Sequence, residues 1–322
     1  MKNPQSPSRA EIEHAASLLR AGKLVAFPTE TVYGLGANAL DAAAAARIFE
    51  AKGRPATSPI IVHVSNMEMA REVAAEWPAA AQILAQTFWP GPLTLVLKKQ
   101  PAVPRNVTAG LETVGVRMPS HPVALALIEA ARIPVAAPSA NRFTQLSPTT
   151  AAHVRVGLGD RVDYILDGGP CMVGIESTVL SLAEGAPVLL RPGGVSRQQL
   201  EEVIGPVAVQ TKSPGEAHPS PGMHPRHYSP RTKLLLVRDG EVPQEGAGAY
   251  LQLHWPPKWE VREIVLMPVD AAEYAAKLYR TLHELDSRDR DWIAVDTPDN
   301  TPEWEAIWDR LRRAASNQQN PD

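Results

Sequence analysis

The sequence "KLVAFPTETVYGLGANAL", residues 23–40, holds the features that decide the fold. Its first part, "KLVAFP", is a short apolar run and predicts a buried strand. Hydroxyl side chains follow at once, and two glycines then predict a turn; these residues are Thr29, Thr31, Tyr33, Gly34 and Gly36. Hydroxyls and free backbone N–H groups just after a strand bind anions and amino acids well. A glycine-rich turn with incidental threonines is the alternative that this stretch alone leaves open.

Strands and helices alternate around this stretch. Ser8 and Glu11 fit a capping box at the start of an amphipathic helix that ends at Gly22. Further apolar runs predict strands: "IIVHV", "LTLVLKK", "VGVRM", "IPVAA", "VDYIL", "STVLSL" and "PVLLRPG". Helical patterns separate the first of these strands, but the last three follow one another almost without a helix. The pattern therefore favours an α/β domain over residues 1–205 with a twisted mixed sheet, not a purely parallel one.

A change in composition marks the end of this domain. Residues 206–231 are rich in Pro, Ser, Gly and His, which is typical of a linker. Within them, "SPGMHPRHYSP" also carries side chains that bind phosphate and stack on bases, namely His224, Arg226, His227 and Tyr228. Residues 232–322 again alternate strand and helix patterns and predict a small Rossmann-like α/β domain. No G-x-G-x-x-G follows its first strand, so a dinucleotide site is not indicated.

Composition excludes several classes of protein. The 322 residues are 44% apolar and carry a net charge of -3, so the strongly basic surface of a dedicated nucleic-acid binder is missing. No apolar run reaches the length of a membrane-spanning helix, and the first residues do not resemble a signal peptide. The single cysteine, Cys171, excludes an internal disulfide and fits a reducing cytoplasm.

Basic residues mark candidate anion ligands. Lys52 and Arg54 stand at a predicted helix end in "AKGRPATSPIIVHV", where fixed cations would suit a polyphosphate. They could instead neutralise the carbonyl end of the helix. Ser58 and His63 follow in the same stretch, and a lone histidine in an apolar strand is more often a core residue.

A second group of candidates stands at predicted strand ends. Arg117 lies in the apolar run "VGVRM", and a buried guanidinium needs a carboxylate partner, either a structural Glu or Asp or a substrate. Ser139 and Asn141 follow the strand "IPVAA", at the position where open α/β sheets bind ligands. Arg191 stands at a predicted strand end before two glycines. The alternative to a binding role is that the Arg-Pro-Gly-Gly sequence only forms a turn.

Several catalytic schemes lack their motifs. The sequence has no G-x-x-x-x-G-K-[ST], G-x-S-x-G, H-E-x-x-H or C-x-x-C. Prolines separate the clustered His218, His224 and His227, so we expect no zinc site and no metal held by the protein alone.

Taken in order, nine stretches resemble the YrdC family in its long form, which has a linker and a second domain. They are "FPTETVYGLG", "KGRP", "PIIVHV", "FWPGPLTLVL", "VGVRMPSHP", "PSAN", "GIESTV", "LRPGG" and "SPGMHPRHYSP". The resemblance implies a nucleotidyltransferase reaction in which L-threonine, bicarbonate and ATP give threonylcarbamoyl-adenylate and pyrophosphate. Threonine would capture bicarbonate as a carbamate, which then attacks the α-phosphate. The protein need only position the reactants, stabilise charge and exclude water.

The resemblance also assigns roles to residues of this sequence. Threonine would be bound by Thr31, His63, Arg117 and Ser177, with Arg117 on its carboxylate. Lys52 and Arg54 would act on the phosphates as the catalytic cations. The nucleotide would be bound by Arg54, Ser58, Thr113, Ser139, Asn141, Arg191 and Tyr228. Mg²⁺ would bridge phosphate oxygens with few protein ligands. Two positions depart from the family pattern. The family often has Asn where this sequence has Ser58, and it commonly has an aromatic residue where this sequence has Pro225.

The same resemblance implies a pathway. The product would pass to a transferase complex that modifies adenosine in tRNA, while direct tRNA binding stays open. We expect residues 220–230 to close over the nucleotide as a lid, with Tyr228 reaching the ATP. Two alternatives remain: a relative that forms carbamoyl-adenylate from carbamoyl phosphate, and an RNA-binding module without chemistry. The first would need zinc-finger and acylphosphatase-like segments that this sequence lacks.

Overall fold

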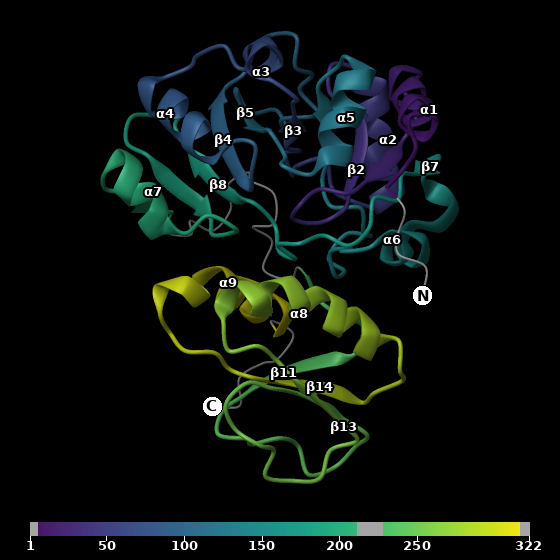
Figure 1. Ribbon diagram of the computed structural model, residues 1–322, viewed down its shortest axis with the longest axis vertical. Helices are drawn as coiled ribbons and strands as arrows, with labels where there is room; N and C mark the ends of the chain where they lie inside the picture. The colour runs from purple at the N-terminus through teal and green to yellow at the C-terminus, as the bar shows by residue number, and fades with distance from the viewer. Residues whose placement is uncertain (1–5, 211–227, 316–322) are drawn as a thin grey trace.

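The computed structural model describes residues 6–210, called here the N-terminal unit, and residues 228–315, called the C-terminal unit (Figure 1). The elements of the N-terminal unit are α1 (Arg9–Arg20), β1 (Val25–Phe27), β2 (Gly34–Asn38), α2 (Ala42–Lys52), β3 (Val62–His63), α3 (Met67–Val73), α4 (Ala79–Phe88), β4 (Leu93–Lys98), β5 (Thr113–Arg117), α5 (Pro122–Ala131), β6 (Val135–Ala136), α6 (Ala151–Leu158), the 3-10 turn η1 (Gly159–Arg161), β7 (Tyr164–Ile165), β8 (Thr178–Ser181), β9 (Val188–Arg191), α7 (Arg197–Ile204) and β10 (Ala208–Val209). The elements of the C-terminal unit are β11 (Lys233–Val237), β12 (Ala249–Gln252), β13 (Glu263–Leu266), α8 (Ala271–Asp286), β14 (Trp292–Asp296), the 3-10 turn η2 (Pro302–Trp304) and α9 (Glu305–Ala315).

The N-terminal unit is built on one mixed sheet. Within the described residues its strands follow the order β10-β9-β8-β4-β5-β3-β6-β2-β1-β7. The pair β4–β8 is parallel, for example, whereas β4–β5 is antiparallel. Helices pack on this sheet and contribute small and aliphatic side chains, including those of α1, α2 and α5, to a continuous buried core. The α/β class with a mixed sheet predicted from the spacing of apolar runs is therefore confirmed.

The first hairpin departs from the expectation in one respect. Gly34 and Gly36, predicted to form a turn, lie in strand β2, which pairs antiparallel with β1. A Cβ atom at Gly36 would lie 2.9 Å from the ring of Phe27 and 3.1 Å from the carbonyl oxygen of Val25. Glycine is needed here because the strand packs closely against its neighbours, and the chain reverses earlier, between Phe27 and Gly34.

Helix starts follow the capping signals in the sequence. Ser8 accepts a hydrogen bond from the backbone of Glu11, whose carboxylate accepts one from the backbone of Ser8, so the predicted capping box forms. Asp41 accepts hydrogen bonds from the first turn of α2, and Ser196 caps α7 in the same way.

The C-terminal unit has a small parallel sheet. Among the described residues its order is β11-β14-β12-β13, and every pair is parallel. Figure 1 shows α8 and α9 between this sheet and the N-terminal unit. The predicted small Rossmann-like α/β pattern is confirmed.

The two units share a buried apolar interface. Val32, Leu146 and Ile175 of the N-terminal unit belong to the same buried cluster as residues of α8 and α9. Gly174, with φ of 77°, brings the chain so close to α8 that a Cβ there would lie 2.5 Å from the carbonyl oxygen of Ala275. The C-terminal unit is thus fitted against the loop that leads into β8.

The predicted linker is described only in part. Its first residues form β10, which pairs with β9 and extends the sheet past residue 205. Residues 211–227, which include His224, Arg226 and His227, lie outside the described residues, as does most of the predicted lid. No helix in the described part of the chain has both the length and the apolar character needed to cross a membrane.

Candidate active site

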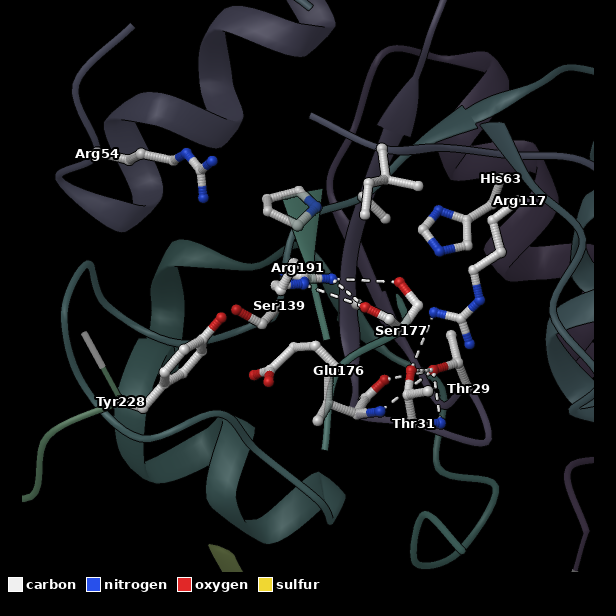
Figure 2. A pocket seen from close by; sticks show the side chains of 15 residues that line it. Thr29, Thr31, Arg54, His63, Arg117, Ser139, Glu176, Ser177, Arg191 and Tyr228 are labelled. Carbon is white, nitrogen blue, oxygen red and sulfur yellow. Dashed lines mark hydrogen bonds between the residues drawn. The ribbon is translucent and has the colours of Figure 1, made fainter. Parts of the chain in front are cut away.

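One pocket collects most of the predicted site residues (Figure 2). Its lining includes Thr31, Arg54, His63, Arg117, Ser139, Ser177, Arg191 and Tyr228. In Figure 2, His63 and Arg117 lie near Thr29 and Thr31 on one side, whereas Arg54 and Tyr228 lie on the opposite side. Four other predicted residues, Lys52, Ser58, Thr113 and Asn141, do not line it.

Strand ends place the side chains of the pocket. His63 is the last residue of β3, Arg117 the last residue of β5, and the two are register partners in a parallel pair. Arg191 ends β9 in the same way. Gly34 of β2, Ile61 just before β3 and Ala137 just after β6 line the pocket as well. Since β6 runs antiparallel to β3, the pocket lies against the sheet and not only beyond the ends of its strands.

Arg117 is held by three different groups. Its Nη2 lies 2.7 Å from Oε1 of Glu30, and both side chains are buried. Nη1 donates to Oγ1 of Thr31 at 3.0 Å, and Nε donates to the carbonyl oxygen of Gly91 at 3.2 Å. The partner that the sequence left open is therefore a structural glutamate. A guanidinium has five N–H groups, so donors remain for a ligand carboxylate.

His63 is a neutral imidazole. Burial, together with the nearby charge of Arg117, lowers its pKa to about 3. Its ring meets Phe27 edge to face at a centroid distance of 6.1 Å. A neutral ring beside Arg117 has a nitrogen that can accept a hydrogen bond from an amine, and it adds no charge to the pocket.

The other side of the pocket is cationic. Arg54 is buried and donates from Nη2 to the carbonyl oxygen of Pro59 at 3.0 Å. No acidic side chain in the described ranges forms an ion pair with it. Burial is the main cause that lowers the pKa of Arg54 to about 10; Tyr228 acts in the opposite direction, and the charge of Arg191 adds to the lowering. Two buried guanidinium groups near each other favour an anionic ligand.

Arg191 and Ser177 form the middle of the pocket. Nη2 of Arg191 donates to the carbonyl oxygen of Ser177 at 2.9 Å and to its Oγ at 3.2 Å. The same hydroxyl lies 2.8 Å from Oγ1 of Thr94. These bonds fix the Ser177 hydroxyl between the side of the pocket that holds Arg117 and the side that holds Arg54.

Lys52 binds the loop that forms one wall of the pocket and does not itself line the cavity. Its Nζ donates to the carbonyl oxygens of Ser139 and Asn141 and to the side-chain oxygen of Asn141. Burial lowers the pKa of Lys52 well below its usual value, and Arg54 adds to this effect. The lysine thus ties the end of α2 to the loop after β6, which presents Ser139 to the pocket.

The remaining predicted residues lie around this pocket. Ser58 is buried in the loop after α2. Thr113, at the start of β5, lines a separate cavity together with Thr94. Asn141 faces a third cavity, shared with His153 and His283.

Tyr228 belongs both to the pocket and to the interface between the units. Only 1% of its surface is exposed, and it lines the pocket with Arg54 and Arg191. Its backbone has φ of 61°, in the left-handed region. Its ring lies 5.9 Å from that of Tyr279 on α8, so the residue joins α8 to the pocket.

Two charged residues of the site were not predicted from the sequence. Glu176 lines the pocket beside Ser177, and Arg310 of α9 forms an ion pair with it at 2.9 Å. A weak signal for Arg310 exists, because it stands three residues after Ile307 and one before Leu311, on the apolar face of its helix. No local pattern predicts that this face meets Glu176, which lies 134 positions earlier in the chain.

Known proteins resemble this chain along nearly all of its length. Residues 17–193 match the Sua5/YciO/YrdC family, described as "Telomere recombination". Residues 195–316 match a family described as "Threonylcarbamoyl-AMP synthase, C-terminal domain". A threonylcarbamoyl-AMP synthase from Pyrococcus abyssi is 43% identical over 323 residues, covering 95% of this chain and 94% of that protein. The Bacillus subtilis protein of the same name is 42% identical, with 96% and 94% covered.

Solved structures give the same result. The crystal structure of P. abyssi Sua5 complexed with L-threonine has a TM-score of 0.90 and 41% identity to this chain, covering 97% of this chain and 96% of that one. A structure of a doubly substituted variant of P. abyssi Sua5 has a TM-score of 0.87 and 40% identity, with 96% and 93% covered. The resemblance inferred from nine short motifs is confirmed, and the chain belongs to the Sua5/YciO/YrdC family.

Proposed function

We propose that this chain is an enzyme that makes threonylcarbamoyl-adenylate and pyrophosphate from L-threonine, bicarbonate and ATP. The observation that carries the proposal is the pocket with two different sides, one suited to an amino acid and one to a polyphosphate. Relatives named threonylcarbamoyl-AMP synthase over nearly the whole chain support it. The P. abyssi structure with L-threonine supports the amino-acid substrate.

Threonine would occupy the side that holds Arg117 and His63. The remaining donors of Arg117 would bind its carboxylate, while Glu30 keeps the guanidinium in place. The hydroxyl of Thr31, fixed by Arg117 and by Thr29 at 2.8 Å, would also contact the amino acid. Neutral His63 would accept a hydrogen bond from the amine, which must lose its proton to react with bicarbonate.

ATP would lie on the side that holds Arg54, Arg191 and Tyr228. The amine of threonine adds to bicarbonate with loss of water, and an oxygen of the resulting carbamate attacks the α-phosphate as pyrophosphate leaves. The two arginines would stabilise the charge that develops on the phosphate groups. The Ser177 hydroxyl lies between the two sides, where carbamate and α-phosphate would meet. No protein nucleophile is required, since the pocket supplies position, charge and shelter from water.

Mg²⁺ would enter with the nucleotide. Among the residues that the structure describes, no group of three or more His, Cys, Asp or Glu side chains could hold a metal. The pocket carboxylate of Glu176 is already bound by Arg310 and Tyr279. We expect phosphate oxygens and water to be the main ligands of this ion, which would neutralise polyphosphate charge.

Pyrophosphate release tests the proposal. We expect release from ATP with Mg²⁺ that falls to background when either threonine or bicarbonate is omitted. Release that depends on neither would contradict it, and RNA binding without any turnover would favour a binding module. As further parts of the proposal, the product is handed to a tRNA-modifying transferase complex, and the enzyme works in the cytoplasm, which the single cysteine fits.

A further inference from the structure

Arg310 is the largest fully buried side chain of the described residues, although it lies on a helix of the C-terminal unit. Its Nε donates to Oε2 of Glu176 at 2.9 Å, and its Nη1 donates to the carbonyl oxygen of Pro192 at 2.7 Å. Its guanidinium carbon lies 5.3 Å from the centroid of the Tyr228 ring. Arg310 of α9 therefore contacts two pocket residues, Glu176 and Tyr228. It also contacts Pro192, which follows the pocket residue Arg191 in the chain.

The carboxylate of Glu176 is surrounded by donors from both units. Ser147 donates from Oγ at 2.5 Å, and Tyr279 of α8 donates from its hydroxyl at 3.2 Å. Arg310 supplies the positive charge, since neither of these hydroxyls carries one. Burying a charge without a counter-charge is costly, so the position of Glu176 depends on α9.

A carboxylate is an unusual group for this pocket. If the pocket binds ATP as proposed above, Glu176 faces a ligand with several negative charges, and like charges in a buried site repel strongly. Paired with Arg310, Glu176 adds no net charge to the wall. Without Arg310, the same carboxylate would oppose the cations Arg54 and Arg191.

We propose that Arg310 is a positioning residue of the active site, which neutralises Glu176 so that the pocket accepts the polyphosphate of ATP. The inference rests on the proposed function and extends it. The C-terminal unit contributes a buried cation to the electrostatics of a pocket whose other described walls belong mostly to the N-terminal unit. Arg310 does not touch the reactants and acts through Glu176 and Tyr228.

A purely structural role makes a different prediction. If the ion pair only holds the two units together, then Arg310→Met and Glu176→Gln should both weaken the binding of nucleotide, because both break the pair. If Arg310 acts by neutralisation, the two substitutions should have opposite signs. Arg310→Met leaves Glu176 without its cation, whereas Glu176→Gln removes a negative charge from the pocket wall and leaves Arg310 paired with Asp309, whose Oδ2 lies 3.0 Å from its Nη1.

Equilibrium binding of a nonhydrolysable ATP analogue to the full chain decides between them. We expect Arg310→Met to raise the Kd of the analogue by about tenfold or more, while the Kd of threonine changes less than about twofold. Glu176→Gln alone should bind the analogue at least as tightly as the parent. The double variant should return to within about threefold of the parent, because the charge of Glu176 is gone and Asp309 keeps its ion pair with Arg313 at 2.8 Å.

A matched control separates charge from loosened packing. His153 of α6 stacks on His283 of α8 at a centroid distance of 3.9 Å, at the same interface but outside the pocket. His153→Ala should lower the melting temperature without raising the Kd of the analogue. Arg310→Lys, which keeps the charge, should bind the analogue nearly as well as the parent.

Three results would overturn the inference: an unchanged Kd in Arg310→Met, weaker binding in Glu176→Gln, or a double variant as weak as Arg310→Met. If Arg310→Met alone does not fold, Glu176→Gln and the double variant still decide the question. The binding readout does not require turnover. If the variants show this order of affinities but the parent protein releases no pyrophosphate, the proposed function is contradicted and the role of Arg310 stands.

Discussion

Nη2 of Arg117 lies 2.7 Å from Oε1 of Glu30, and the side chains of both residues are almost completely buried. The pair gives a buried arginine at the end of an apolar strand the counter-charge that it needs. Glu30 belongs to the same turn as Thr31, whose hydroxyl accepts a hydrogen bond from Arg117. The guanidinium is thus oriented before threonine arrives, which reduces the cost of ordering it on binding.

Arg117→Ala should abolish measurable threonine binding and also destabilise the protein. Loss of the guanidinium removes the carboxylate ligand and leaves Glu30 buried without its counter-charge, which costs roughly 3–5 kcal/mol of unfolding free energy. Titration calorimetry with threonine and urea denaturation measure the two effects. In Arg117→Ala/Glu30→Gln much of the stability should return, but threonine binding should not. Unchanged threonine affinity in the single variant would show that Arg117 is only structural.

Arg54→Met should weaken ATP binding without destabilising the fold. No acidic side chain of the described residues pairs with Arg54, so its removal strands no charge. Hydrogen bonds to charged groups contribute about 1.5–3 kcal/mol, so we expect an affinity loss of about 10- to 100-fold. Threonine affinity should stay the same, and the exposed Arg71→Met serves as the control. Equal weakening of ATP and threonine would argue against a phosphate contact.

Lys52→Met should weaken ATP and AMP by the same factor. Lys52 donates to the loop that carries Ser139 and Asn141, so its loss should disturb the grip on the nucleoside, which both ligands share. Competition binding of the two nucleotides measures the ratio. A loss confined to ATP would instead mean that Lys52 turns toward the outer phosphates when the nucleotide binds.

Acidification should destabilise the protein, in part through His63. Its pKa is about 3 in the folded protein, because burial and Arg117 disfavour the charged ring, and about 6.5 when unfolded. Between these values only the unfolded state takes up the proton, so the contribution of His63 to the unfolding free energy falls by roughly 1.4 kcal/mol per pH unit as pH drops below 6.5. Urea denaturation at several pH values should show a shallower dependence for His63→Gln. The exposed His14→Gln should match the parent, and an equal slope in both variants would contradict the assignment.

Much of the fold could be predicted because it depends on local patterns. The capping residues Ser8 and Ser196 mark two helices, and short apolar runs mark most strands. Gly36 misled the prediction, since a glycine that permits close strand packing looks the same in sequence as one that permits a turn. The positions of Phe27 and Val25 across the hairpin distinguish the two.

Less of the site could be predicted, because its electrostatics depend on contacts between distant residues. Arg117 could be recognised as needing a partner, but not that this partner is Glu30, which lies far earlier in the chain. Glu176 and Arg310 become a pair only when α9 docks on the N-terminal unit. Lys52 could be recognised as a cation near the site, but its direction follows from the carbonyl groups of Ser139 and Asn141.

The fate of the bicarbonate carbon tests the central claim most directly. The purified protein would be incubated with isotopically labelled bicarbonate, threonine, ATP and Mg²⁺, and the adenylate product analysed by mass spectrometry. We predict a threonylcarbamoyl-adenylate that carries the label in its carbamoyl group, with pyrophosphate formed in equal amount. An adenylate without the label, or pyrophosphate formed without any threonine-containing adenylate, would contradict the account.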